Sequence, residues 1–295
     1  MKECDPKSCA TCTNKGKGSR EEVIRCKLNQ IKHKILVMSG KGGVGKSSVA
    51  TYLSLALAQK GYQVGLMDID LHGPSIPKMF GLHGVLNITQ EKEIVPHQYS
   101  PNLKVVSIES MMEDTDSAII WRGPLKHGVI QQFIGDCKWD QLDFLVIDCP
   151  PGTGDEPLSI CRIIPEIMAV IVTTPQEVAL ADVRKSINFC KKMNVEILGL
   201  VENMSGLYCP HCNGFIPIFG TGGGEKTSER MKVPFLGPLP FEPAVVVGGD
   251  RGRPILEDEQ DSPFKDAVLS FADKILARLP EVESAADAAP AHTVH

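Results

Sequence analysis

Short apolar runs alternate with longer amphipathic segments from Ile31 onward. The apolar runs are Ile35–Met38, Val64–Met67, Leu103–Ile108, Phe144–Ile147, Met168–Val172, Ile197–Val201 and Pro234–Leu236. The segments with helical periodicity are Lys46–Gln59, Ala118–Ile134, Val178–Met193, Glu225–Met231 and Pro263–Leu279. Uninterrupted apolar strands that alternate with helices are typical of a parallel sheet that helices cover on both faces. The pattern therefore predicts an α/β protein.

The two ends of the chain lack this pattern. Residues 1–30 are polar and rich in Lys and Cys, so we expect a separate N-terminal extension there. Residues 31–280 contain all the predicted elements, and we expect them to form one large domain. Residues 281–295 are Ala-rich and acidic and have no apolar face, which predicts a flexible tail with solvated His292 and His295.

The first apolar run leads into a glycine-rich loop, Gly40-x-x-x-x-Gly45-Lys46-Ser47, and a helical segment follows at once. Glycines let backbone N–H groups wrap phosphates, and the helix N-terminus favours negative charge. Lys46 should reach the β- and γ-phosphates, and the Ser47 hydroxyl should ligate Mg²⁺. We therefore expect ATP to contact Gly40, Lys41, Gly42, Gly43, Val44, Gly45, Lys46, Ser47 and Ser48.

Polar side chains follow three other apolar runs. Asp68 and Asp70 come after Val64–Met67, Asp148 comes after Phe144–Ile147, and Asn203 comes after Ile197–Val201. The carboxyl ends of parallel strands meet at one crevice, where ligands bind. We expect Asp70 to orient the attacking water, Asp68 to lie near the Mg²⁺ shell and Asp148 to hold Mg²⁺ through a water. Asn203 can present a donor and an acceptor to an adenine edge, and the Gly-Thr-Gly-Asp at 152–155 is a candidate switch for the γ-phosphate.

The ten cysteines fall into three groups. In a chain with cytosolic character, cysteines are metal or redox candidates before they are disulfides. Cys209 and Cys212 form a Cys-x-x-Cys pair, and a polar segment carries Cys4, Cys9, Cys12 and Cys26. The remaining four lie in or near apolar segments, where we expect small buried side chains: Cys137, Cys149, Cys161 and Cys190.

The Cys209/Cys212 pair offers two thiolates, whereas zinc or an iron–sulfur cluster takes four ligands. A symmetric dimer would bring two such pairs together on its axis, and we favour a bridging cluster with His211 as a spacer. A zinc knuckle, a redox pair and a chance pair stay open. The N-terminal four could close a second site within one chain, but their spacing does not separate [4Fe–4S] from zinc or from a metal-free tail.

Five motifs in this order resemble the Mrp/ApbC family of iron–sulfur cluster carrier ATPases, bacterial relatives of the cytosolic scaffold ATPases of eukaryotes. The motifs are Gly-Lys-Gly-Gly-Val-Gly-Lys-Ser, Asp-Ile-Asp-Leu-His-Gly-Pro-Ser-Ile-Pro, Asp-Cys-Pro-Pro-Gly-Thr-Gly-Asp, Glu-Asn-Met-Ser-Gly and Cys-Pro-His-Cys. The resemblance covers about residues 31–280. It implies a three-layer P-loop NTPase fold with a mostly parallel sheet of about seven or eight strands.

The resemblance also implies a mechanism. It points to a homodimer that binds ATP and Mg²⁺, hydrolyses ATP slowly, receives a [4Fe–4S] cluster from a donor scaffold and delivers it to apo iron–sulfur proteins. Lys41 corresponds to the signature lysine that crosses the dimer interface to the partner's nucleotide, as an arginine finger does. The N-terminal cysteines resemble the ferredoxin-type extension of the eukaryotic branch, but their long gap comes last instead of first.

Charge and hydropathy narrow the alternatives. The net charge of −5 argues against a protein that coats nucleic acid. No stretch approaches the roughly 20 apolar residues of a membrane span, and the first residues lack the apolar region of a signal peptide. We therefore expect a cytoplasmic protein that binds neither nucleic acid nor membrane. The alternatives are a MinD- or ParA-like positioning ATPase, which the acidic tail disfavours, and a zinc-stabilised nucleotide-binding regulator.

Overall fold

The computed structural model describes residues 19–70, 73–111, 123–209, 211–212, 214–258 and 260–279. Nine strands of these residues form one sheet in the order β10-β9-β8-β1-β7-β2-β6-β5, and β11 also pairs with β9. The strands are β1 (Ile31–Ser39), β2 (Val64–Asp68), β5 (His97–Ser100), β6 (Leu103–Ser107), β7 (Leu142–Asp148), β8 (Met168–Thr173), β9 (Glu196–Tyr208), β10 (Phe215–Ile216) and β11 (Phe235–Phe241). A separate two-stranded sheet joins β3 (Asn87–Ile88) to β4 (Ile94–Val95).

The seven strands predicted from apolar runs are all present, and they pair in parallel. The mostly parallel α/β sheet is therefore confirmed. The sheet has nine strands among the described residues, where seven or eight were expected. The additional strands, β5 and β10, are short antiparallel strands, and every residue in them is at least partly exposed. Neither strand has the buried apolar run that reveals a central strand.

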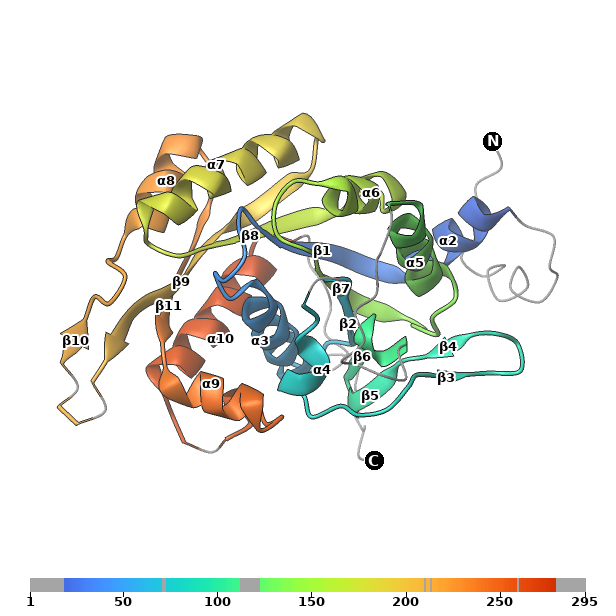
Figure 1. The fold of residues 1–295 in the computed structure, drawn as a ribbon, viewed down its shortest axis with the longest axis horizontal. Coiled ribbons are helices and arrows are strands. Elements are labelled where there is room, and N and C mark those ends of the chain that lie inside the picture. Colours follow the sequence, from blue (N-terminus) through green and yellow to red (C-terminus); the bar gives the residue numbers. More distant parts are fainter. Residues whose placement is uncertain are drawn as a thin grey trace, which may run out of the picture.

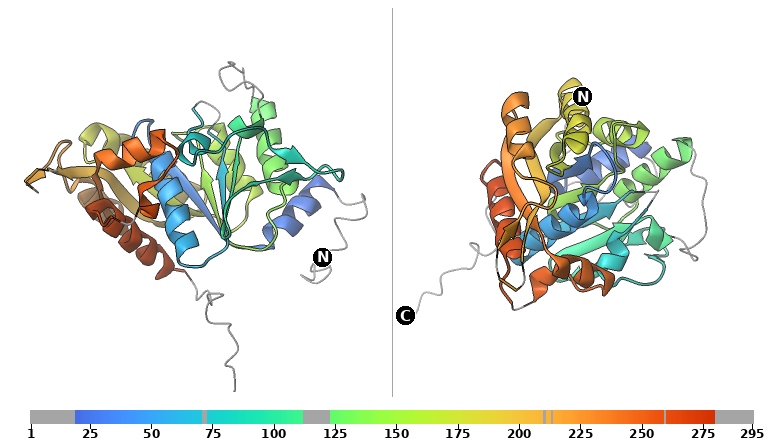
Figure 2. Two further views of the ribbon diagram at one scale, coloured as in Figure 1. Left: turned by 90° about the horizontal axis from the view of Figure 1, so that it is seen from below. Right: turned by 60° about the vertical axis from the view of Figure 1, so that its left-hand side comes forward.

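Helices cover both faces of the sheet (Figures 1 and 2). One face carries α3 (Lys46–Gln59), α4 (Ile76–Met79), α9 (Pro243–Asp250) and α10 (Pro263–Leu276). The other face carries α2 (Arg20–Leu28), α5 (Gly123–Gly135), α6 (Asp155–Ile163), α7 (Glu177–Lys192) and α8 (Gly223–Met231). Strand β1 serves both cores, because successive side chains of a strand point to opposite faces. Ile35 and Val37 belong to the first core, and Leu36 and Met38 to the second.

The five predicted helices are present, with small shifts at their ends. Helix α3 has the predicted bounds, whereas α10 ends at Leu276 instead of Leu279. The first residues of the segment predicted as Ala118–Ile134 lie outside the described residues, and α5 begins at Gly123. Within the described residues, no helix has the length and apolar character that a membrane span requires.

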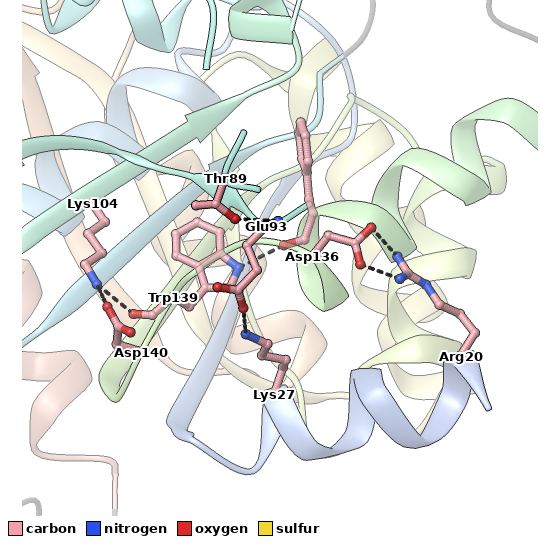
Figure 3. Close-up of polar contacts among 9 residues, drawn as sticks. Arg20, Lys27, Thr89, Glu93, Lys104, Asp136, Trp139 and Asp140 are labelled. Carbon is pink, nitrogen blue, oxygen red and sulfur yellow. Dashed lines mark hydrogen bonds and ion pairs between the residues drawn. The ribbon is translucent and has the colours of Figure 1, made fainter. Parts of the chain in front are cut away.

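The N-terminal part of the described chain is a packed helix. The sequence assigns residues 1–30 to a polar extension, but α2 buries Ile24 and Leu28 in the core shared with α5. Ser19 begins the helix with a reciprocal capping box to Glu22. Figure 3 shows the Arg20 guanidinium donating to both carboxylate oxygens of Asp136. Residues 20–28 therefore pack as part of the domain.

Candidate nucleotide site and cysteine loop

The glycine-rich loop connects the central strand β1 to α3, as the phosphate-binding motif requires (Figure 1). Gly43 and Gly45 both have φ of 80°, a left-handed conformation that favours glycine. A Cβ on Gly40 would lie 2.3 Å from the carbonyl carbon of Asp182 in α7, so that helix packs directly on the loop. A Cβ on Gly43 would meet no heavy atom within 4 Å, so this part of the loop faces open space.

The ends of three elements converge on Lys46, the first residue of α3. Its Nζ lies 2.6 Å from Asp148 Oδ1 at the end of β7 and 3.4 Å from Asp70 Oδ2 after β2. The Ser47 hydroxyl donates to the other oxygen of Asp148 at 2.6 Å. The structure thus brings together the lysine, the hydroxyl and two of the three predicted carboxylates.

Asp68 supplies a third buried carboxylate beside this group. One of its oxygens accepts from the backbone N–H of Asp70 at 3.0 Å, and the other accepts from the Ser107 hydroxyl at 3.0 Å. Burial, followed by repulsion from Asp148, raises the pKa of Asp68 to about 8. Burial also raises the pKa of Asp148, although Lys46 opposes that shift. A divalent cation would reduce the cost of keeping both carboxylates ionised, so the donor set fits Mg²⁺.

The amino group of Lys46 responds to the same charges in the opposite sense. Burial lowers the pKa of Lys46, but the attraction of Asp148 more than offsets that effect, and the pKa is raised. Lys46 therefore stays positively charged and neutralises part of the carboxylate cluster.

Strand β9 reaches the phosphate loop through Asn203. The Asn203 side-chain amide donates to the Val44 carbonyl at 2.9 Å. A Cβ on Gly45 would lie 2.1 Å from the Asn203 amide nitrogen, so the two segments are in direct contact. The sequence did not reveal this contact. The predicted role of Asn203 at an adenine edge stays a prediction.

The candidate switch segment also lies next to the loop. The Gly152 N–H donates to the Ser39 carbonyl at 2.8 Å, and the Ser39 hydroxyl donates to the Lys41 carbonyl at 2.9 Å. A change at residues 152–155 can therefore reach Lys41 through two hydrogen bonds.

Cys209 and Cys212 lie immediately beyond β9, in a segment that we call the cysteine loop (residues 209–222). Cys209 is partly exposed and Cys212 is exposed. Hydrogen bonds from the backbone N–H groups of His211 and Cys212 lower the pKa of the Cys209 thiol. This arrangement favours the thiolate, which is the form that binds metal.

Large apolar side chains flank the two cysteines in the sequence. Tyr208 and Phe215 are 44% and 48% exposed, and their rings contact each other edge to face. Ile216, Ile218 and Phe219 are exposed in the same loop. The β9–β10 hairpin projects at the end of the molecule opposite α2 (Figure 1). In the described part of the cysteine loop, no third His, Cys, Asp or Glu side chain joins Cys209 and Cys212 in a group that could hold a metal ion.

The other described cysteines differ from this pair in their burial. Cys137, Cys149 and Cys190 are buried, as expected, and Cys161 is half-buried. Burial raises the pKa of Cys161 to about 11 and that of Cys190 to about 12, so both are poor thiolates. Of the N-terminal set, Cys26 is buried in α2, whereas Cys4, Cys9 and Cys12 lie outside the described residues.

Comparison with known proteins places this geometry in a family. Residues 30–276 match the family model described as ParA, NUBPL iron-transfer P-loop NTPase. The chain belongs to this family. It is 45% identical to the cytosolic Fe-S cluster assembly factor NUBP2 homolog of Monosiga brevicollis, over 92% of this chain and 97% of that protein. It is 46% identical to the iron-sulfur cluster carrier protein of Saccharolobus solfataricus, over 86% of each chain.

Solved structures with the same fold support the assignment of this chain to the P-loop NTPase family. The nucleotide-binding protein of Archaeoglobus fulgidus in complex with ADP is 36% identical, with a TM-score of 0.71 over 83% of this chain and 96% of that chain. The cell division ATPase MinD of Pyrococcus furiosus is 28% identical, with a TM-score of 0.61 over 83% and 98% of the two chains. The expected P-loop NTPase fold is thereby confirmed.

Glu202 is a buried polar residue whose role the sequence pattern does not reveal. Its side chain is fully buried at the end of the apolar part of β9 and accepts three hydrogen bonds. The sequence gives one indication of a functional residue here: an acidic residue directly follows the apolar run Ile197–Val201 and precedes Asn203. A buried carboxylate must be satisfied by donors, but the sequence does not show which donors approach it.

Proposed function

We propose that this chain is an ATP-dependent iron–sulfur cluster carrier. In this proposal a homodimer holds a [4Fe–4S] cluster between its subunits, accepts it from a donor scaffold and transfers it to apo-proteins in the cytosol. The observation that carries the proposal is the layout of β9, which contacts the phosphate loop through Asn203 and leads directly into the Cys209/Cys212 pair. The names of the relatives from Monosiga brevicollis and Saccharolobus solfataricus support the same cargo.

The nucleotide half of the proposal assigns roles to described residues. The amides of the phosphate loop and Lys46 would bind the phosphates, and Ser47, Asp68 and Asp148 would surround Mg²⁺ directly or through water. Mg²⁺ would supply positive charge to the phosphoryl oxygens. Asp70, whose carboxylate lies 3.4 Å from Lys46, would orient the attacking water. We expect slow hydrolysis, with Lys41 of each subunit acting on the nucleotide of the other.

The cysteine half requires two copies of the chain. Cys209 and Cys212 contribute two thiolates, and a cluster of the [4Fe–4S] type takes four. A second copy related by a two-fold axis would complete the set. The exposed apolar side chains around the loop would then be covered, which is favourable for association. Cys4, Cys9, Cys12 and Cys26 remain candidates for a second cluster.

Anaerobic reconstitution tests the proposal. The purified chain is treated with iron and sulfide, and its visible absorption, iron content and zinc content are measured. We expect cluster absorption that the double variant Cys209→Ala/Cys212→Ala lacks and that Cys161→Ala, a control at a cysteine outside the loop, retains. Transfer to an apo-ferredoxin is then followed with and without ATP. Stoichiometric zinc without iron would contradict the carrier function and support the zinc-stabilised regulator instead.

A further inference from the structure

A single buried carboxylate ties together the two ends of the cysteine loop. Glu202 is fully buried in β9, and one of its oxygens accepts from the Ser205 hydroxyl at 2.6 Å and from the Gly222 N–H at 3.0 Å. Its other oxygen accepts from the Gly224 N–H at 2.5 Å. Ser205 precedes the loop, while Gly222 and Gly224 lie where the chain returns to start α8. The carboxylate therefore links, by hydrogen bonds, Ser205 before the loop to Gly222 and Gly224 at its end.

Apart from the backbone pairing of β9 with β10 and β11, which extends to Tyr208 and Leu207, few buried contacts fix the described part of the cysteine loop on the domain. All of its described residues from 211 to 221 are exposed. A cavity of about 630 Å³ lies against its base, lined in part by Glu202, Ser205, Phe215 and Glu225. The contact between Tyr208 and Phe215 holds the β9–β10 hairpin together internally. Strand pairing and the hydrogen bonds at the base, rather than dense side-chain packing, thus set the position of the loop.

The backbone between the nucleotide site and the cysteines is bent. Met204 and Gly206 have φ of 56° and 79°, which interrupts the extended conformation of β9. Ser205 lies between these two residues, and its hydroxyl is bonded to Glu202. The Glu202 carboxylate therefore also holds the bend through which β9 reaches Cys209.

Glu202 is next to the residue that touches the phosphate loop. Asn203 donates to the Val44 carbonyl, and Glu202 accepts from the cysteine-loop base. Adjacent residues of a strand point to opposite sides. Asn203 therefore contacts the phosphate loop, while Glu202 next to it binds the base of the cysteine loop. A displacement of the Asn203 backbone would carry Glu202 with it, because the two residues share a peptide bond.

We propose that Glu202 is a positioning residue that sets the place of the cysteine loop relative to the phosphate loop and passes nucleotide-dependent movement to Cys209 and Cys212. This inference rests on the proposed function for the identity of the cargo. The positioning role itself can be measured without a cluster, through the reactivity of the Cys209 and Cys212 thiols.

Thiol alkylation in the metal-free chain tests this role. Cys209 and Cys212 are alkylated with iodoacetamide, with and without ATP and Mg²⁺, and each rate is followed by peptide mass spectrometry. Glu202→Gln keeps the shape but turns one acceptor into a donor that faces an N–H group. We expect Cys209, which is only partly exposed, to react up to about tenfold faster, since losing one hydrogen bond to a charged group increases local opening by that order. Cys212 is already exposed, so its rate should change less. In the wild type we expect ATP with Mg²⁺ to change the alkylation rates. In Glu202→Gln this change should disappear, while the affinity for a fluorescent ADP analogue stays unchanged.

Two further variants keep the test decisive. Glu225→Gln, at an exposed glutamate in the first turn of α8, removes the same charge and should behave like the wild type. Ser205→Ala removes one of the three donors to Glu202, so it should increase the alkylation rate less than Glu202→Gln does. If Glu202→Gln does not fold, Ser205→Ala takes its place in the test. Wild-type rates in Glu202→Gln, equal changes in Glu225→Gln, or wild-type thiols that ignore ATP would each overturn the proposal. A wild-type chain that binds no cluster would contradict the proposed function and leave this test intact.

Discussion

At the scale of single residues, the nucleotide site is shaped by charges and close approaches that occur inside the chain. Lys46 is held by Asp148 and Asp70, so a phosphate must compete with these carboxylates for its amino group. Gly45 combines a left-handed φ with direct contact to the Asn203 amide. The loop therefore depends on this glycine for two separate reasons, its backbone conformation and its missing side chain.

Replacing Gly45 with alanine separates those two reasons when it is compared with Gly61→Ala. Gly61 also has a positive φ, of 91°, but a Cβ there meets nothing within 4 Å. Both variants should lose about 1–2 kcal/mol of unfolding free energy from backbone strain alone. Gly45→Ala should also weaken ATP binding by about tenfold or more, because the loop must give up the Asn203 hydrogen bond. Urea unfolding and nucleotide titration measure the two effects, and equal ATP affinity in both variants would refute the second.

At the scale of elements, β9 and α2 show how one segment links distant parts of the chain. Strand β9 joins the phosphate loop to the cysteine loop, as described above. Helix α2 connects the segment that carries the N-terminal cysteines to the core. It is held by the apolar contacts of Ile24 and Leu28 and by the pairs Arg20–Asp136 and Lys27–Glu93 (Figure 3). Residues 20–28 are therefore fixed on the domain.

Loosening α2 should be measurable without loss of the fold. Arg20→Ala removes the pair with Asp136 and the hydrogen bond to the Gln131 carbonyl. Both charged side chains are about one-third exposed, so solvent screening limits the expected loss to about 1 kcal/mol. Hydrogen exchange should show about fivefold faster exchange of the α2 amides, with ATP affinity unchanged. Arg25→Ala, an exposed arginine in the same helix, is the control. Equal exchange in the two variants would show that the ion pair does not hold α2.

At the scale of the whole molecule, the sequence predicts the architecture better than the contacts between elements. Apolar runs reveal the central strands because those strands are buried on both faces. Helix α9 escapes detection because its Pro-Ala-Val-Val-Val-Gly-Gly-Asp sequence combines β-branched residues and glycines, although Pro243 suits a first helical turn. The convergence of Asp70 and Asp148 on Lys46 is predictable, since parallel strands end at one edge. The contact of Asn203 with Val44 joins residues 159 positions apart, and no local pattern encodes it.

If Lys41 acts on the nucleotide of the partner subunit, two inactive variants should recover ATPase activity when they are mixed. Lys41→Ala keeps its own phosphate-binding lysine, whereas Lys46→Met keeps Lys41 and loses ATP binding. Each variant alone should be nearly inactive, with a loss of about 10³-fold or more for the finger lysine. A one-to-one mixture should recover about a quarter of wild-type ATPase activity, because half of the dimers are mixed and each has one competent site. Colorimetric phosphate release measures this, and a mixture as inactive as its components would exclude action in trans.

The position of β1 at the centre of the sheet has a consequence for synthesis on the ribosome. Its partners are β7 and β8, and the first pair joins Ile31 to Leu142. Translation of the intervening chain takes about ten seconds at ordinary elongation rates. During that interval the apolar strand at Ile35–Met38 has left the tunnel without its neighbours. The nascent chain is therefore exposed to misfolding before its phosphate loop can close, and it should engage chaperones until β7 and β8 emerge.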